Sequence, residues 1–310
     1  MKSQQNLYTP LVSVGIPTYN RPKGLEKTLE CMTNQSYGNL EVIICDNASD
    51  DPDVLQVVRY FQSIDRRIIY YKHEKNIGPV LNFLSAVKVA TGDFFMWAAD
   101  DDRWENFFIE TAINAFRTLP DDFIAVNCEA QYFDKNTGEN LPFFAEGEAF
   151  YCFASSSPVS RLKHVFINNY GNLVYSVFRM HALRAISSLK FCENEIPIIF
   201  QLSNIGNWKI LPQVGWYKAV KLSTYDNLKW EVTGGVHPRR LTTVKDLLAT
   251  QAFTLKYHFR AFRDIISAIK TLNLSIKDEW ILNCLVGWQL FGHLCSIIFG
   301  YKPRKEWRAK

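Results

Sequence analysis

The sequence predicts an α/β fold, with a mostly parallel sheet flanked by helices and a C-terminal helical appendage. Two observations support this prediction. Strand-like and helix-like patterns alternate from residue 11 to about residue 118, and such alternation is typical of βαβ units that build a parallel sheet. From residue 241 onward the pattern is helical, in two pieces separated near Asn273. We therefore expect one large domain followed by additional helices.

The strands of the first half are predicted by short apolar runs rich in β-branched residues, at residues 11–16, 40–45, 67–71 and 93–98. Apolar residues at helical spacing predict the helices between them, at residues 24–35, 52–62 and 80–90. Ser49 or Asp50 precedes the second of these helices, and either side chain is suited to cap it.

The second half is less regular. It contains strand-like runs at residues 123–133, 172–180, 208–211 and 214–220, and a helical run at residues 198–205. Residues 134–158 predict a long loop, which in a compact domain is usually functional or mobile. The chain thus divides into a tail expected to be disordered, two halves of one domain, and C-terminal helices with a basic end, at residues 1–10, 11–120, 121–240 and 241–310.

Composition excludes several classes of protein. The net charge of +4 is too small to indicate a nucleic-acid-binding protein. The seven cysteines form no CxxC pair, which favours reduced thiols in the cytoplasm over a disulfide framework or a zinc site. The first ten residues contain no apolar signal region, so we expect no secretion.

Three adjacent carboxylates, Asp100, Asp101 and Asp102, end the fourth predicted strand. Because like charges repel, a compensating cation is expected there, and Mg²⁺ or Mn²⁺ bound to a diphosphate suits oxygen ligands. The alternative is a helix N-terminus with Asp102 as its cap. Polar clusters also follow the other three strands, and ligands bind at this edge of a parallel sheet. Neither GxGxxG nor GxxxxGK[ST] occurs, so a dinucleotide site of the usual kind and a P-loop are both disfavoured.

Four ordered motifs carry a resemblance: LVSVGIPTYNRP, LEVIICDNASDD, KNIGPVLNF and GDFFMWAADDDRW. With them the chain resembles the family 2 glycosyltransferases of the GT-A fold, closely over residues 11–104 and more loosely to about residue 225. The resemblance implies that residues 11–120 bind a nucleotide sugar and that residues 121–240 bind the acceptor. The donor would be a UDP, GDP or dTDP sugar, and the acceptor a saccharide or a lipid-linked saccharide.

The resemblance also implies roles for individual residues. Pro17, Thr18 and Tyr19 would flank the nucleotide base, with Tyr19 stacking on it in a loop that includes Asn20. Asp46 would accept a hydrogen bond from the base, although a turn residue that caps the next helix is the plain alternative. The ribose and diphosphate would lie along Asn76 and Gly78, with Asp100 near the ribose. Asp101 would be the principal metal ligand, and Asp102 would lie beside the metal or the donor sugar.

Glu195 occupies the position of the general base of an inverting transfer in the family, and Glu193 is its rival. Direct displacement at an anomeric carbon requires a carboxylate that takes the proton of the acceptor hydroxyl. It also requires a Lewis acid at the departing nucleoside diphosphate. A second carboxylate nucleophile would serve only a retaining mechanism.

The chain departs from the family pattern in two places. Many members read Asp-x-Asp-Asp, where this chain has Ala99 at the first position. Many members also carry a His after the last strand, near Lys221. Two other functions remain open at this point: a sugar nucleotidyltransferase, and a non-catalytic carbohydrate- or nucleotide-binding protein. The first usually carries a Gly-rich basic loop after strand one, which residues 17–22 lack.

Residues 280–301 contain no Asp, Glu, Lys or Arg and are long enough to span a bilayer. However, Gln289, His293 and Ser296 form a polar stripe, which indicates an amphipathic helix. A basic tail, residues 302–310, follows at once. We expect an interfacial helix that docks on an anionic membrane surface. The alternative is a helix packed on the core or on the partner in a homodimer.

Overall fold

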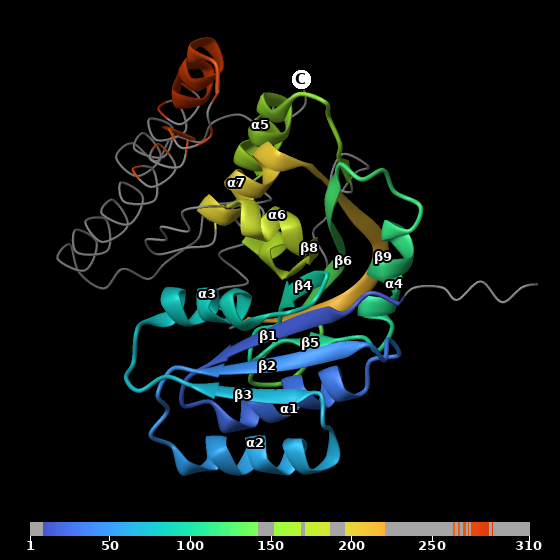
Figure 1. Ribbon diagram of the computed structural model, residues 1–310, viewed down its shortest axis with the longest axis vertical. Helices are drawn as coiled ribbons and strands as arrows, with labels where there is room; N and C mark the ends of the chain where they lie inside the picture. The colour runs from blue at the N-terminus through green and yellow to red at the C-terminus, as the bar shows by residue number, and fades with distance from the viewer. Residues whose placement is uncertain are drawn as a thin grey trace, which may run out of the picture.

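The computed structural model describes residues 9–141, 152–168, 171–186 and 196–220, together with part of residues 263–287. The first half alternates strand and helix as predicted. Its elements are β1 (Val12–Thr18), α1 (Pro22–Thr33), β2 (Leu40–Asp46), α2 (Pro52–Ile64), β3 (Ile68–Lys72), α3 (Pro79–Val89) and β4 (Phe94–Trp97). These strands pair in parallel in the order β3-β2-β1-β4 (Figure 1).

The second half continues the same sheet beyond β4 in the order β8-β6-β9-β5, and β7 pairs with β9. Its elements are β5 (Arg103–Trp104), α4 (Phe108–Phe116), β6 (Phe123–Asp134), β7 (Cys152–Phe153), α5 (Pro158–Asn168), a 3₁₀ helix (Gly171–Tyr175), β8 (Val177–Arg179), α6 (Met180–Ala185), α7 (Ile196–Ile205) and β9 (Asn207–Val220). Among the described strands of the second half, β6 and β9 pair in parallel and the other pairs are antiparallel. The predicted α/β class is confirmed, and the parallel part of the sheet is the half that precedes the carboxylates.

Helices cover both faces of the sheet and create two hydrophobic cores. On one face α1, α2 and α4 bury apolar residues such as Leu29, Val58 and Ile109. The helices α3, α5, α6 and α7 lie on the other face (Figure 1). They bury residues such as Leu162 and Ile199. The strands of the first half are therefore sandwiched, which explains why they read as apolar runs rather than as alternating patterns.

Residues 172–180 were expected to form one strand, and this expectation is wrong. The segment begins as the 3₁₀ helix, and only Val177–Arg179 belongs to β8. Ser176 closes the turn between them, because both its backbone N–H and its hydroxyl donate to the Leu173 carbonyl, at 3.1 and 2.7 Å. Leu173 and Val174 are buried in the core, so an apolar run has here been mistaken for a strand.

The predicted strands 208–211 and 214–220 are one continuous strand, β9. Its pairing with β6 shifts register between Cys128 and Glu129, where Leu211 and Val214 are the respective partners. Pro212 lies in the bulge this creates, as expected for a residue without a backbone donor. The residue that caps α2 is Asp51, whose side chain accepts from the Asp53 N–H, not Ser49 or Asp50.

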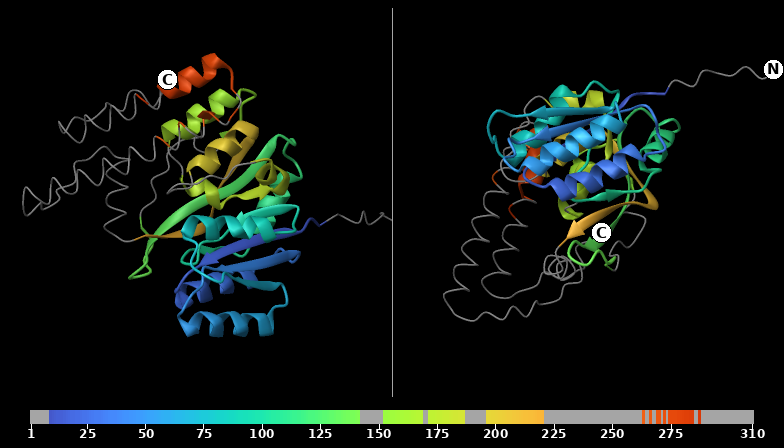
Figure 2. Two further views of the ribbon diagram at one scale, coloured as in Figure 1. Left: turned by 60° about the vertical axis from the view of Figure 1, so that its left-hand side comes forward. Right: turned by 90° about the horizontal axis from the view of Figure 1, so that it is seen from below.

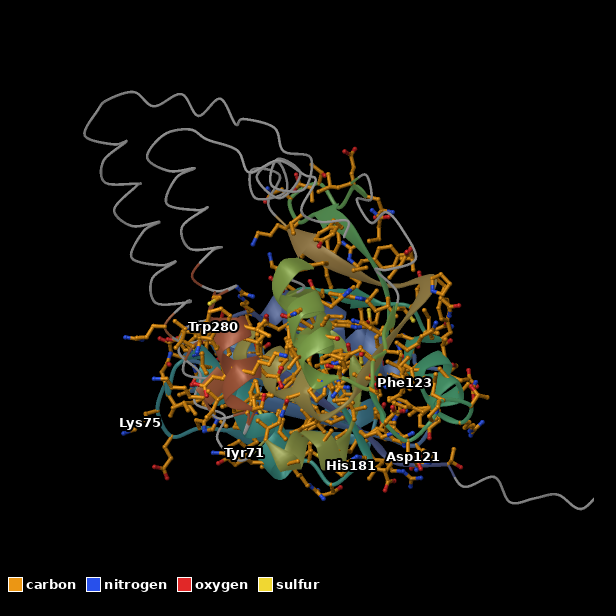
Figure 3. The ribbon with its side chains drawn as sticks, turned by 90° about the horizontal axis from the view of Figure 1, so that it is seen from above. Tyr71, Lys75, Asp121, Phe123, His181 and Trp280 are labelled. Atoms are coloured by element: carbon orange, nitrogen blue, oxygen red, sulfur yellow. The ribbon has the colours of Figure 1, made fainter. Side chains whose placement is uncertain are left out.

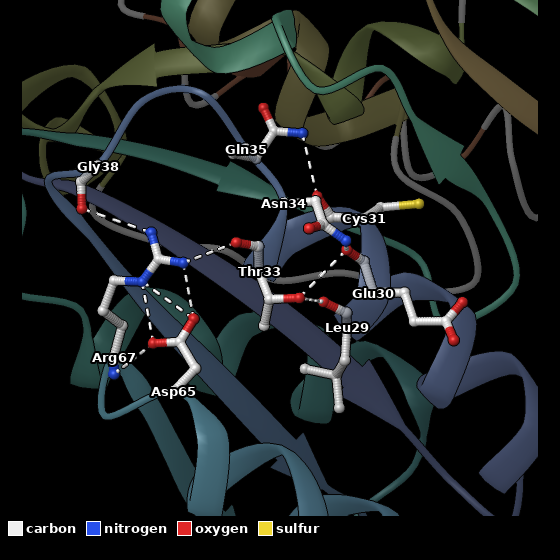
Figure 4. A network of polar contacts seen from close by, with 9 residues as sticks. All are labelled: Leu29, Glu30, Cys31, Thr33, Asn34, Gln35, Gly38, Asp65 and Arg67. Atoms are coloured by element: carbon white, nitrogen blue, oxygen red, sulfur yellow. Dashed lines mark hydrogen bonds and ion pairs between the residues drawn. The ribbon is translucent and has the colours of Figure 1, made fainter.

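A polar network closes the C-terminus of α1 (Figure 4). The Arg67 guanidinium donates to the carbonyls of Thr33 and Gly38, at 3.0 and 3.4 Å. It also binds the Asp65 carboxylate, with its closest contact at 2.6 Å. The guanidinium thereby satisfies a terminal helix carbonyl and fixes the α1–β2 connection to the start of β3.

The described residues near the C-terminus lie beside α5 and α7 (Figure 2). Ile269, Leu272 and Leu282 are buried in the core of that face, whereas Ile276 and Trp280 are 90 % and 67 % exposed. Figure 3 shows Trp280 at the rim of the molecule, on the other side from Asp121. Within the part of the chain that the structure describes, no helix has the length and apolar content needed to cross a membrane. Most of the segment 280–301 lies outside the described residues.

Candidate active site

The predicted site residues of the first half gather where the parallel strands end. The register pairs Thr18 of β1 with Asp46 of β2, and Asp46 with Lys72 of β3. The carboxylates follow β4, which pairs with β1 on its other side. Residues that are far apart in the sequence therefore meet at one edge, as sequence reasoning expected.

Asp100 is held from two sides. Thr18 Oγ1 donates to its Oδ2 at 2.8 Å, and Arg21 Nη1 donates to its Oδ1 at 2.9 Å. Burial raises the pKa of Asp100, while Arg21 and Thr18 act in the opposite direction. The side chain is only 8 % exposed, and both carboxylate oxygens bind protein partners in this arrangement.

Asp101 is the more accessible carboxylate. Its side chain is 37 % exposed, and its Oδ2 lies 3.1 Å from the same Arg21 Nη1. The described residues contain no group of three or more His, Cys, Asp or Glu able to hold a metal ion. This donor set fits Mg²⁺ or Mn²⁺, because these ions are usually held by one or two carboxylates and take further ligands from substrate phosphates and water. Arg21 shows that a cation already bridges the Asp100–Asp101 pair.

Asp102 turns away from its two neighbours. Its Oδ1 accepts from the backbone N–H of Ala219 in β9, at 2.8 Å, and the residue is 3 % exposed. Burial raises the pKa of Asp102 to about 7, although Lys218 opposes the shift. Asp102 thus ties the carboxylate loop to the second half of the sheet, and its role beside the metal or donor sugar stays a prediction.

Asp46 is fully buried at the end of β2. Its Oδ1 accepts from the Ser49 N–H at 2.8 Å, and its Oδ2 accepts from the Tyr70 hydroxyl at 2.6 Å. Lys72 Nζ lies 3.9 Å from the same Oδ2. Burial and the contact with Asp46 raise the pKa of Tyr70. The carboxylate therefore orders the loop after β2, and it does not cap α2, because Asp51 does.

Asparagines join neighbouring loops at the same edge. Asn20 has a φ of +52°, and its Oδ1 accepts from the N–H groups of Asp50 and Asp51, at 3.0 and 3.1 Å. Asn47 Nδ2 donates to Asn76 Oδ1 at 3.0 Å, and its Oδ1 accepts from the Ile77 N–H at 2.8 Å. These bonds connect the three loops, so Asn20 and Asn76 hold the loops in place.

Tyr19 and Gly78 are both accessible from solvent, Tyr19 more so. Tyr19 is 43 % exposed, which leaves its ring available for stacking. Gly78 is the N-cap of α3, with φ +86° and ψ 157°, a conformation that is essentially restricted to glycine. No atom lies within 4 Å of the position a Cβ would take. Pro17 pairs with Cys45 across β1 and β2 and fixes the exit of the strand.

Sequence reasoning missed several residues that build this edge. Arg21 is the N-cap residue of α1 and the partner of two carboxylates. Thr28 donates to the Ala99 carbonyl at 3.0 Å. Asn82 Nδ2 donates to the Cys45 carbonyl at 2.8 Å and reaches the Thr18 carbonyl at 3.4 Å. Gly24 allows α1 to approach the Asp100 backbone. A polar or small residue on the otherwise apolar face of a helix was the available signal for the last three.

Glu193 and Glu195 lie outside the described residues, as does Lys221. Their assignment as the catalytic base or its rival therefore stays a prediction. The described chain resumes at Ile196, the first residue of α7.

The structure gathers polar side chains at one edge of the parallel half-sheet, and comparison with known proteins gives the family. The model of glycosyl transferase family 2 matches residues 13–177, which is more than half of the chain. This protein belongs to that family.

Curated relatives match shorter stretches. The abequosyltransferase RfbV of Salmonella typhimurium is 39 % identical over 94 residues, covering 30 % of this chain and 28 % of the relative. A GalNAc(5)-diNAcBac-PP-undecaprenol β-1,3-glucosyltransferase of Campylobacter jejuni is 37 % identical over 95 residues, covering 30 % of each chain. An uncharacterized glycosyltransferase of Rickettsia typhi is 29 % identical over 134 residues, covering 43 % of this chain and 41 % of the relative. The matches thus span less than half the length of these relatives.

Solved structures support the GT-A fold over nearly the whole chain. S. aureus TarS (residues 1–349) aligns with a TM-score of 0.59 at 18 % identity, covering 96 % of this chain and 76 % of its own. The mannosyltransferase PcManGT of Pyrobaculum calidifontis, solved with GDP-Man and Mn²⁺, aligns with a TM-score of 0.57 at 15 % identity, covering 94 % and 72 %. At these identities the likeness establishes the fold alone.

Proposed function

We propose that this protein is a metal-dependent, inverting glycosyltransferase that transfers a sugar from a nucleoside-diphosphate sugar to an acceptor hydroxyl. The observation that supports it best is the pair Asp100–Asp101 at the edge where the loops after β1, β2 and β3 are joined by hydrogen bonds. A partly exposed carboxylate beside loops that hydrogen bonds hold together is what a metal-bound diphosphate requires. Family membership supports the same reaction class.

In this proposal the chain's own residues bind and orient the donor. Tyr19 stacks on the base, Asp46 contacts the base, and the loop of Asn76 and Gly78 follows the ribose and diphosphate. Asp101, with Asp100 or Asp102 beside it, holds Mn²⁺ or Mg²⁺. The ion supplies Lewis acidity at the departing diphosphate. The described residues at this edge would bind the donor, and the acceptor side would lie mainly in the second half of the chain.

The chemical step requires one base. The acceptor oxygen forms a bond to the anomeric carbon while the bond from that carbon to the phosphate oxygen breaks, which inverts the configuration. Glu195, or its rival Glu193, takes the hydroxyl proton. We expect the Gln variant of the true base to lose about 10²–10⁴-fold in kcat, with donor affinity unchanged. The anomeric configuration of the product, read by NMR, tests inversion.

The first experiment is thermal stability of the protein against UDP, GDP and dTDP sugars, with and without Mn²⁺. A ligand that binds only the native state raises the melting temperature by mass action. We expect one nucleotide to raise it in the presence of metal, and Asp101→Asn to abolish that shift. Asp50→Asn is the matched control, because Asp50 is an exposed acid in a neighbouring loop. Turnover by Asp101→Asn equal to that of the wild type would contradict the assignment, and donor binding without any turnover would favour a non-catalytic protein.

We further propose a role in polysaccharide or glycolipid assembly at the cytoplasmic face of the membrane. The names of two relatives support this role. The Campylobacter protein is named for an undecaprenol-linked saccharide, and the Bacillus subtilis TuaG is named for teichuronic acid biosynthesis. Ile276 and Trp280, one helical turn apart, are exposed apolar side chains suited to an interfacial contact. Flotation with anionic liposomes tests this. If the full chain and a chain truncated before residue 275 both stay unbound, the membrane contact is absent.

A further inference from the structure

We propose that Arg21 is the resident counter-cation of the Asp100–Asp101 pair and competes with the divalent ion for Asp101. Arg21 thereby sets the metal affinity of the site. This inference rests on the proposed function in one respect, the assignment of Asp101 as a metal ligand. Arg21 itself lies at the start of α1, whereas the carboxylates lie in the loop after β4.

Arg21 contacts both carboxylates through one nitrogen atom. A single nitrogen, Arg21 Nη1, lies 2.9 Å from Asp100 Oδ1 and 3.1 Å from Asp101 Oδ2. One cationic group thus bridges two carboxylates of adjacent residues, which is the place a divalent ion bound to Asp101 would share. Because Arg cannot lose its proton in a protein, this competitor stays charged at every pH at which the protein is folded.

The two carboxylates differ in how firmly the protein holds them. Asp100 Oδ2 is occupied by Thr18 Oγ1, so Asp100 depends on Arg21 at its other oxygen. Asp101 is more weakly engaged: its side chain is 37 % exposed, against 8 % for Asp100. Arg21 can therefore release Asp101 to an ion while it keeps Asp100.

The Arg21 guanidinium is also accessible to solvent. The Arg21 side chain is 54 % exposed, so it can leave Asp101 without opening the core. Removing this side chain leaves two adjacent carboxylates without their counter-charge, which strengthens their attraction for a divalent ion. We expect Arg21→Gln to bind Mn²⁺ about tenfold more tightly, because the substitution removes a positive charge that repels the ion at a partly exposed site.

The experiment is a titration of the full chain with Mn²⁺ alone, in which the EPR signal of free Mn²⁺ reports binding. Wild type is compared with Arg21→Gln and with Lys23→Gln, which removes an exposed positive charge two residues away on α1. Tighter binding by Arg21→Gln with Lys23→Gln unchanged supports the inference, and Asp101→Asn added to Arg21→Gln should remove the gain. If Arg21→Gln fails to fold, Arg21→Met, which keeps an aliphatic side chain, replaces it.

Mn²⁺ affinity of Arg21→Gln equal to or below that of the wild type overturns the inference, as does an equal gain in Lys23→Gln, which would indicate a general charge effect. Absence of Mn²⁺ binding by every variant overturns it as well. The proposed function fails separately, by lack of turnover with every donor. An active enzyme whose Arg21→Gln variant gains no Mn²⁺ affinity refutes this inference alone.

Discussion

Gly24 and Asp100 touch through their backbones: a Cβ built on Gly24 would lie 2.1 Å from the Asp100 carbonyl oxygen. No side chain fits into that distance, so the first turn of α1 and the carboxylate loop can lie this close only with glycine. The same helix contributes Arg21 at its N-cap and Thr28 one turn further along. The position of α1 therefore determines where the carboxylates stand.

We predict that Gly24→Ala disturbs the carboxylates. Alanine favours a helix by about 1 kcal/mol over glycine, so without the overlap the variant would be more stable. The overlap with a backbone atom should instead lower the free energy of unfolding by about 1–3 kcal/mol and weaken Mn²⁺-dependent donor binding. Urea denaturation and a donor titration measure both effects. Gly38→Ala is the control, because nothing lies within 4 Å of its Cβ position; equal behaviour of the two variants would refute the prediction.

The Tyr70 hydroxyl gives a second prediction. It donates to a fully buried carboxylate oxygen of Asp46, and Tyr70→Phe leaves that oxygen without this donor. We expect the free energy of unfolding to fall by about 1–3 kcal/mol and nucleotide affinity to fall as the loop after β2 loosens. Tyr60→Phe is matched to it, since Tyr60 is 60 % exposed and should lose almost nothing. A Tyr70→Phe protein as stable as the wild type would show that Lys72 alone suffices for the Oδ2 of Asp46.

The sequence predicts the edge of the sheet but not the contacts within it. The alternation of strands and helices is enough to predict parallel pairing. Parallel pairing in turn brings Thr18, Asp46 and Asp101, which lie at strand ends, to one edge of the sheet. The partner of Asp102 is not predictable in this way, since the Ala219 N–H lies 117 positions along the chain and depends on how β9 joins the sheet.

Short-range sequence patterns also do not reveal the roles of Arg21, Gly24 and Asn82 at this edge. An arginine after a loop reads as an ordinary surface residue, and its role appears only when β4 brings Asp100 beside it. A glycine in a helix reads as a weak position rather than a site of close approach. Apolar periodicity likewise mistook Leu173 and Val174 for strand residues, because burial in a 3₁₀ turn and burial in a strand need the same side chains.

Gly78 provides a prediction that separates backbone strain from ligand contact. Gly78 and Gly138 both have positive φ, +86° and +79°, and a Cβ would meet no close atom at either. Alanine at each position should therefore cost about 1–3 kcal/mol of strain. Only Gly78→Ala should also weaken donor binding, because Gly78, the N-cap of α3, lies in the loop assigned to the diphosphate. Calorimetric titration with the donor decides this, and equal donor affinities in the two variants would remove Gly78 from the site.

The Asp65–Arg67 pair predicts a pH-dependent stability. Hydrogen bonds from Arg67 hold the pKa of Asp65 below its ordinary value in the folded protein. As the pH falls, the unfolded chain therefore takes up this proton first. The stabilisation is complete above the unfolded value, roughly 3.9, and is lost as the pH falls through the lowered folded value. Asp65→Asn should lower the free energy of unfolding at pH 7 by about 1.5–3 kcal/mol, the range for hydrogen bonds to charged groups.

Urea denaturation of wild type and Asp65→Asn from pH 7 downward measures this effect, and the difference should shrink once the pH falls below about 4. Asp121→Asn is the matched control. Asp121 is fully exposed and its oxygen lies 3.6 Å from Arg179, so salt and water screen the pair and its loss should not change stability measurably. If the stability difference between wild type and Asp65→Asn stays constant across the pH range, the contribution of Asp65 does not depend on its ionisation. The carboxylate would then act by its shape rather than by its charge.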